Sequence, residues 1–142
     1  MKDPESAVMA QDLINKSLQG KCVTKIDNYT QGMWQFYFDE WYFIVSAPWR
    51  LVNPEAFLIG RNDDGQWYGL TEPVNTTTRA TDILHGRKVA SVPTADLRVL
   101  FEGDLEWQVL TDSIGYEPWN FSGKTSNINI VALGGGELSL WY

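Results

Sequence analysis

Two stretches decide the fold of this chain: Leu18–Ile26, "LQGKCVTKI", and Leu84–Val92, "LHGRKVASV". Each begins with leucine, a variable residue, glycine and a basic residue, and each then becomes apolar at alternate positions. The matched pairs are Leu18 and Leu84, Gly20 and Gly86, Lys21 and Arg87, Val23 and Val89, and Ile26 and Val92. Alternation is typical of β-strands, but the shared Leu-x-Gly-basic start is a more specific match. The sequence therefore predicts one unit that occurs twice.

The match continues when "WQFYFDE-WYFIV" is set against "LRVLFEGDLEWQV", so that Phe38 meets Phe101 and Asp39 meets Glu102. Each unit contains a strand, a turn, a second strand that ends in an acidic tight turn, and a third strand. We expect an α+β fold that is mainly β, with two similar antiparallel meanders in a sandwich or partly open barrel. Its 142 residues predict a single domain, 1–142, with repeats of about 18–70 and 84–142.

The N-terminal segment, residues 4–18, is predicted to be a helix. Asp3 suits the N-cap, Pro4 stands where a missing N–H costs nothing, and Gly20 supplies the stop. One face carries Ala7, Ala10, Ile14 and Leu18. We expect this helix to cover a sheet, because it lacks the basic polar face of a membrane-surface helix.

Three later segments carry turn signals. "PEAFLIGRNDDGQWYGL", residues 54–70, predicts a hairpin whose turn is Asp63, Asp64 and Gly65. "TEPVNTTTRATDIL", residues 71–84, predicts a surface connection in which Thr81 or Asp82 caps a short helix. In "ALGGGELSLWY", residues 132–142, only six residues follow the glycines, so we expect a terminal hairpin rather than a phosphate-binding loop.

Charge and composition limit the function. The formal net charge of −7 repels nucleic acids and anionic membranes, and it steers basic proteins toward the chain. One cysteine and one histidine rule out an internal disulfide and a zinc site built from both residue types. The first twenty residues lack the apolar run of a signal peptide, and no stretch is apolar enough to span a membrane. We therefore expect a cytoplasmic protein without metal or cofactor.

Catalysis is not supported by the sequence. His85 has no second histidine and no nucleophile in a recognisable context, and Cys22 resembles a small residue at a strand start. Paired acids occur at turn positions, where Asp and Asn are ordinary turn formers, and the "RNDDGQW" stretch lacks the spacing of a calcium loop. Catalysis by an acid pair would require a carboxylate with a raised pKa. We expect no enzymatic activity.

A protein-binding surface is the interpretation of these acids that we favour over catalysis. Corresponding turns of two repeats present their carboxylates together, and such a surface attracts basic partners, of which nucleases are one example. The predicted contact residues are Asp39, Glu40, Asp63, Asp64, Glu102, Asp104, Glu117, Trp67 and Tyr68. Trp41, Trp49 and Trp119 are further candidate anchors if they are exposed.

The C-terminal half resembles a bacterial family of small uncharacterised domains with a Tyr-Glu-x-Trp motif and a Gly-Gly-Gly-x-Leu-x-x-Trp motif. The motifs fall on Tyr116, Glu117, Trp119, Gly134, Gly135, Gly136, Leu138 and Trp141. The chain departs from the pattern at Pro118 and Leu133. Members are similar to immunity proteins encoded beside toxin genes, including those of contact-dependent growth inhibition. The resemblance implies the fold and assigns the motif a structural role.

We therefore expect an immunity protein that binds a cognate, basic toxin domain and occludes its active site. The alternative is a small-molecule-binding barrel or accessory domain with an aromatic pocket, which a roomy pocket lined by Trp and Tyr would favour. Sheet edges of the two meanders also leave a homodimer open.

Overall fold

Alternating burial along the strands builds this protein from two facing sheets. In the segment 33–38, Trp34, Phe36 and Phe38 are buried while the residues between them are half-buried. The computed structural model describes residues 4–30, 32–92, 97–111, 116–133 and 138–141. Its elements are α1 (Pro4–Leu18), β1 (Lys25–Thr30), β2 (Met33–Phe38), β3 (Trp41–Val45), β4 (Trp49–Val52), β5 (Phe57–Gly60), the 3-10 turn η1 (Arg61–Asp63), α2 (Thr76–Leu84), β6 (Val89–Ser91), β7 (Arg98–Phe101), β8 (Leu105–Val109), β9 (Trp119–Gly123), β10 (Asn129–Ala132) and β11 (Leu138–Trp141).

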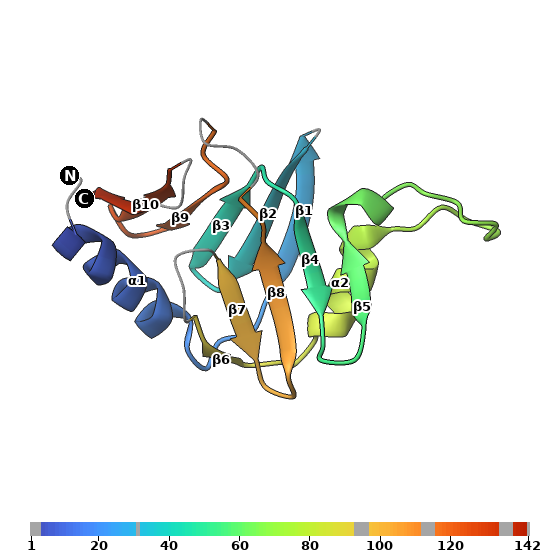
Figure 1. Cartoon of the computed structure of the whole chain (residues 1–142), viewed down its shortest axis with the longest axis horizontal. Coiled ribbons are helices and arrows are strands. Elements are labelled where there is room, and N and C mark those ends of the chain that lie inside the picture. The colour runs from blue at the N-terminus through green and yellow to red at the C-terminus, as the bar shows by residue number, and fades with distance from the viewer. Residues whose placement is uncertain (1–3, 31, 93–96, 112–115, 134–137, 142) are drawn as a thin grey trace.

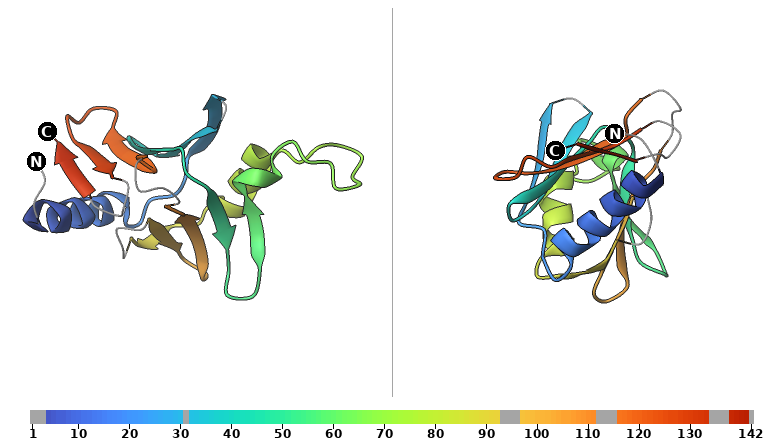
Figure 2. Two further views of the ribbon diagram at one scale, coloured as in Figure 1. Left: turned by 45° about the horizontal axis from the view of Figure 1, so that its top comes forward. Right: turned by 90° about the vertical axis from the view of Figure 1, so that its left-hand side faces the viewer.

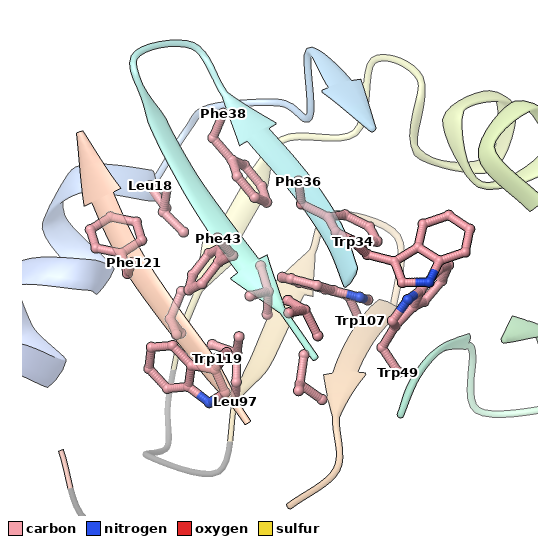
Figure 3. Close-up of a cluster of buried hydrophobic side chains, with 14 of the residues drawn as sticks. Leu18, Trp34, Phe36, Phe38, Phe43, Trp49, Leu97, Trp107, Trp119 and Phe121 are labelled. Atoms are coloured by element: carbon pink, nitrogen blue, oxygen red, sulfur yellow. The ribbon is translucent and has the colours of Figure 1, made fainter. Parts of the chain in front are cut away.

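The strands form two antiparallel sheets, as Figure 1 shows. One has the order β1-β2-β3-β9-β10-β11 and the other β5-β4-β8-β7-β6. Aromatic rings fill the space between them: the ring of Phe36 stacks on that of Trp107 with centroids 4.2 Å apart, and Trp49 meets Phe36 edge to face at 5.0 Å (Figure 3). The predicted mainly β fold with an N-terminal helix is confirmed, and the sheets form a sandwich because they do not close into a barrel.

The two halves of the chain exchange their last strands. The first meander, β1-β2-β3, is extended by β9 and β10 from the second half, and the second meander, β6-β7-β8, is extended by β4 and β5 from the first. Strands β1 to β5 correspond, in order, to strands β6 to β10. Replacing each strand by its counterpart changes the order β1-β2-β3-β9-β10 into β6-β7-β8-β4-β5, which is the order of the other sheet. Each extended meander therefore contains strands from both halves, and among the strands of the described residues only β11 lacks a counterpart.

The two crossovers between sheets match in atomic detail. Val45 pairs with Trp119, and Val109 pairs with Trp49. The Ser46 N–H donates to the carbonyl of Pro118 at 3.0 Å, and the Leu110 N–H donates to the carbonyl of Pro48 at 2.8 Å. The repeated dipeptide Pro-Trp, at 48–49 and 118–119, was the sequence signal for this exchange.

The two helices cover the two open sides of the sandwich (Figure 2). Helix α1 contacts β6 and β11, and helix α2 contacts β1 and β5, so each helix lies against one edge strand of each sheet. The N–H of Val92 donates to Asn15 Oδ1 at 2.7 Å, and the Gln11 amide donates to the Val92 carbonyl. Ala10, Ile14 and Leu18 are fully buried, as the predicted helix face requires.

Three predicted local structures are wrong. The segment 66–70 is not a strand, because Asp63 and Asp64 do not form a hairpin turn. The Asp63 carboxylate instead accepts from the Gly60 N–H, and the Asp64 carboxylate accepts from the Thr76 N–H. Helix α2 begins earlier than expected, since Asn75 Oδ1 accepts from the Thr78 N–H as N-cap. Strand β1 begins at Lys25, so Cys22, Val23 and Thr24 precede it.

Candidate functional site

A narrow loop projects from the sandwich between η1 and α2, at the opposite end of the molecule from the two termini (Figure 1). At its base the Gly65 N–H donates to the Val74 carbonyl, and the Val74 N–H donates to the Gln66 carbonyl, both at 2.8 Å. We call residues 65–74 the aromatic arm. These bonds close the arm at its base and give it a defined course.

The tip of the aromatic arm is a tight turn. The Leu70 N–H donates to the Trp67 carbonyl at 2.7 Å, and the two central residues, Tyr68 and Gly69, have φ angles of 44° and 74°. Positive φ at both central positions defines a type I′ turn, a conformation in which a non-glycine residue such as Tyr68 is uncommon. The turn sets Trp67 and Leu70 opposite each other across its two ends.

Asp63 and Asp64 anchor the aromatic arm to the sandwich. Asp63 Oδ2 accepts from the Gly60 N–H at 2.9 Å, and its Oδ1 accepts from the Tyr68 hydroxyl at 2.8 Å. Asp64 Oδ1 accepts from the Thr76 N–H at 3.0 Å, and its Oδ2 accepts from the Asn28 amide at 3.3 Å. Because the hydroxyl bonds to a carboxylate, the pKa of Tyr68 is raised above its ordinary value. Each acid therefore joins two separate segments.

The aromatic arm exposes its large apolar side chains. Trp67 is 57% exposed, Tyr68 65% and Leu70 53%. At the base of the arm an open hollow of about 690 Å³ lies between the arm, β1 and α2, and Asp64 and Glu72 line it. Grouped apolar side chains on a projecting segment are unfavourable in water unless a partner covers them, so they indicate an interaction site.

Four of the predicted acids lie at the other end of the sheets. The rings of Phe38 and Phe101, which face each other from the two sheets, stack with centroids 6.4 Å apart. The turns that follow them carry the four acids, which we call the acidic rim: Asp39, Glu40, Glu102 and Asp104. Corresponding turns of the two repeats thus lie at one end of the sandwich.

Basic side chains offset the charge of the acidic rim. Lys21 Nζ lies 3.6 Å from Asp39 Oδ2, and Arg87 Nη1 donates to the carbonyl of Glu102 at 3.3 Å. The basic residue of the Leu-x-Gly-basic motif therefore covers the acidic turn of its own repeat. Glu40 accepts from the Thr125 hydroxyl at 2.8 Å. The rim is consequently a mixed-charge surface rather than a purely negative one.

The motif residues near the C-terminus lie in different environments. Trp119 and Leu138 are each 2% exposed, whereas Tyr116 is 81% and Trp141 56% exposed. Glu117 is exposed, its carbonyl accepts from the Ser46 hydroxyl, and the Ser46 carbonyl accepts from Arg61. Strand β11 pairs with β10 as the expected terminal hairpin requires. Gly134, Gly135 and Gly136 lie outside the described residues.

The proposed tryptophan anchors divide sharply. Trp49 and Trp119 are buried core residues, so their assignment as exposed anchors is wrong, and Trp41 is half-buried against the core. Their place after the crossover prolines points them between the sheets. Leu70 is an exposed residue that sequence reasoning missed. Its position directly after the turn-forming Gly69 was the available signal.

Buried aromatic rings contact one another between the sheets, where the alternative interpretation places an aromatic pocket. The Nε1 atoms of Trp49, Trp107 and Trp119 are buried without a hydrogen-bond acceptor, and each indole meets a neighbouring ring edge to face. Such contacts allow weak N–H···π interactions. Figure 3 shows the rings interleaved between the sheets. Trp34, Trp49, Trp107 and Trp119 thus serve to pack the core.

Candidate catalytic groups and metal ligands are few in the part of the chain that the structure describes. The Arg98 guanidinium, which donates to the Glu106 carboxylate, lowers the pKa of that carboxyl, the opposite of what acid catalysis would require. Among the described residues, no group of three or more His, Cys, Asp or Glu side chains could hold a metal ion. No helix within these ranges is long and apolar enough to cross a membrane.

Comparison with known proteins gives no relative from which a function could be transferred. No protein-family model matches the chain, and no curated protein and no solved structure matches it. The geometry of the aromatic arm and the acidic rim must therefore carry any functional argument.

Proposed function

We propose that this protein is a cytoplasmic immunity protein, which binds a cognate, basic toxin domain through the aromatic arm and occludes that domain's active site. The observation that carries the proposal is the exposure of Trp67, Tyr68 and Leu70 on a projecting segment. The resemblance of the C-terminal motifs to immunity proteins and the net charge of −7 add support. The protein acts by binding and catalyses no reaction, so it requires no cofactor.

The aromatic arm suits this task better than the acidic rim. Its hydrogen bonds at base and tip fix the backbone of the arm, and the Tyr68–Asp63 bond holds the Tyr68 side chain before a partner arrives. Pre-organisation reduces the entropy lost on binding, and Trp and Tyr are the residues that most often dominate interfaces. At the rim, Lys21 pairs with Asp39, and the Arg87 guanidinium lies beside the backbone of Glu102, so two positive charges already stand next to the acids.

Long-range attraction is the second part of the proposal. The chain's negative charge accelerates encounter with a basic domain, and added salt screens this attraction. Nucleic acid is not a partner, because the same charge repels phosphates. A homodimer built from exposed sheet edges is less favoured than the sequence suggested, since α1 and α2 lie against the edge strands.

The test is protection of bacteria that express the toxin domain encoded beside this gene. Trp67→Ala should weaken binding about thirtyfold or more and reduce protection, as expected for a hot-spot anchor. Trp141→Ala is the matched control, because Trp141 is 56% exposed and Trp67 57%, at opposite ends of the molecule. Equal loss in both variants, or no binding by the unaltered chain, would contradict the proposal.

A further inference from the structure

Helix α1 carries further apolar side chains beside its buried stripe, at the end of the molecule opposite the aromatic arm: Met9 is exposed, and Leu13 is half-buried against the core. Met9 and Leu13 lie one helical turn apart, beside the buried stripe of Ala10 and Ile14. Met9 is 56% exposed, and its neighbour Val8 is 63% exposed. The apolar surface of the helix therefore extends beyond the part that packs on the sandwich.

A hollow of about 430 Å³ lies between these side chains of α1 and the C-terminal strands. Its lining residues are Met9, Asp12, Leu13, Lys16, Ile128 and Leu140. Four of the six are apolar, so the hollow is suited to receive apolar side chains of a partner. We call this hollow and the α1 residues that line it the α1 face.

The charges on the α1 face identify its occupant. Asp12 and Lys16 are both exposed and line the hollow with opposite charges, so the lining has no net charge. The whole chain carries −7, which makes two copies repel each other over most of their surface. A neutral apolar face is where two copies can approach, whereas a basic partner is attracted to negative surfaces elsewhere.

The order of the two charges is also self-complementary. A twofold axis that crosses the helix between Asp12 and Lys16 sets two α1 helices antiparallel. Asp12 of each copy then lies opposite the partner subunit's Lys16, which gives two ion pairs around an apolar centre formed by Leu13 of both copies. We propose that the α1 face is a self-association surface whose occupant is a second copy of this chain.

This dimer is compatible with binding of another protein by the arm. The α1 helix and the aromatic arm lie at opposite ends of the molecule, as both Figure 1 and Figure 2 show. Two copies joined through α1 therefore hold their arms at the two far ends of the assembly, where each remains exposed. The inference does not depend on the identity of a toxin partner.

Sedimentation equilibrium of the full chain tests the proposal directly. We expect a dimer whose population rises with concentration. Lys16→Asp would place the new carboxylate opposite Asp12 of the second copy, and this repulsion should raise the dissociation constant about tenfold or more. Asp12→Lys should do the same. The double variant, Asp12→Lys with Lys16→Asp, restores opposite charges and should recover most of the unaltered affinity, a result that simple loss of folding cannot give.

Arg79→Asp is the matched control, because it makes the same charge change at an exposed position on α2. It should leave the dissociation constant unchanged within about twofold, and thermal unfolding of each variant checks that it is folded. Met9→Ser offers a second route to a monomer without any change of charge. A chain that stays monomeric up to about 1 mM overturns the proposal, as does a double variant no tighter than the single ones.

Discussion

Asn15 supplies a hydrogen-bond acceptor next to the edge strand β6, as a neighbouring strand would. Its side-chain oxygen accepts the Val92 N–H at 2.7 Å, and Val92 is 2% exposed. Asn15→Ala removes this acceptor and leaves a buried donor unpaired, which should cost about 1–2 kcal/mol of unfolding free energy. Urea unfolding measures the change, and Gln19→Ala, at an exposed position after the same helix, should change it little. Equal effects of both would mean that the bond contributes nothing.

The Arg98–Glu106 pair makes part of the stability pH-dependent. The hydrogen bond from Arg98 lowers the pKa of the folded Glu106 carboxyl below its value in the unfolded chain. Its contribution is therefore fully present above the unfolded pKa and is lost as pH falls through the folded pKa. Glu106→Gln should lower stability at about pH 7, and this difference from the unaltered chain should shrink at about pH 3. A difference that stays constant with pH would contradict this assignment.

The sequence also shows where residue-level inference stops. Alternation in "MWQFYF" correctly predicts which side chains of β2 are buried. Trp49 and Trp67 are the same residue type, but one is 2% and the other 57% exposed, and hydrophobic alternation does not separate them. The difference arises from the exchange of strands between halves, which places Trp49 opposite Phe36 of the other sheet.

Residues 67–73 of the aromatic arm are all exposed, so we expect that the sandwich does not need them for its stability. The Val74 N–H already donates to the Gln66 carbonyl at 2.8 Å, the spacing of a two-residue hairpin turn. Replacing residues 67–73 by Asn-Gly, the pair preferred in type I′ turns, should close the chain without strain. We expect the unfolding free energy to change by less than about 1 kcal/mol in urea unfolding. A larger loss would mean that the arm supports the core.

Element boundaries were predictable where local chemistry alone fixes them. Pro4 and Gly20 delimit α1 in the sequence as they do in the structure, where Gly20 has a φ of 80°. The 3-10 turn η1, where Asp63 accepts from the Gly60 N–H, and the start of α2, where Asn75 is the N-cap, were missed. Asp64 also bonds to Thr76, twelve positions along the chain. Turn propensity indicates that an Asp such as Asp64 favours a turn. It does not show from which distant N–H the carboxylate accepts a hydrogen bond.

At the scale of the whole molecule, the exchange of strands makes the two halves interdependent. Strand β9 pairs with β3 and β4 pairs with β8, so neither half contains a complete sheet. Fragments 1–69 and 70–142, divided at the tip of the aromatic arm, should each be unfolded alone and should recover the sandwich when mixed. Circular dichroism of the fragments, separate and combined, measures this. A fragment that folds alone would contradict the interdependence.

The central claim is that the aromatic arm binds the toxin domain encoded beside this gene. Calorimetric titration of that domain into the full chain and into the chain with residues 67–73 replaced by Asn-Gly tests it most directly. Provided that both chains unfold at similar urea concentrations, we predict tight binding to the full chain and a loss of about a hundredfold or more on replacement of the arm. Equal affinity for the two chains, or no binding to the full chain, would contradict the account.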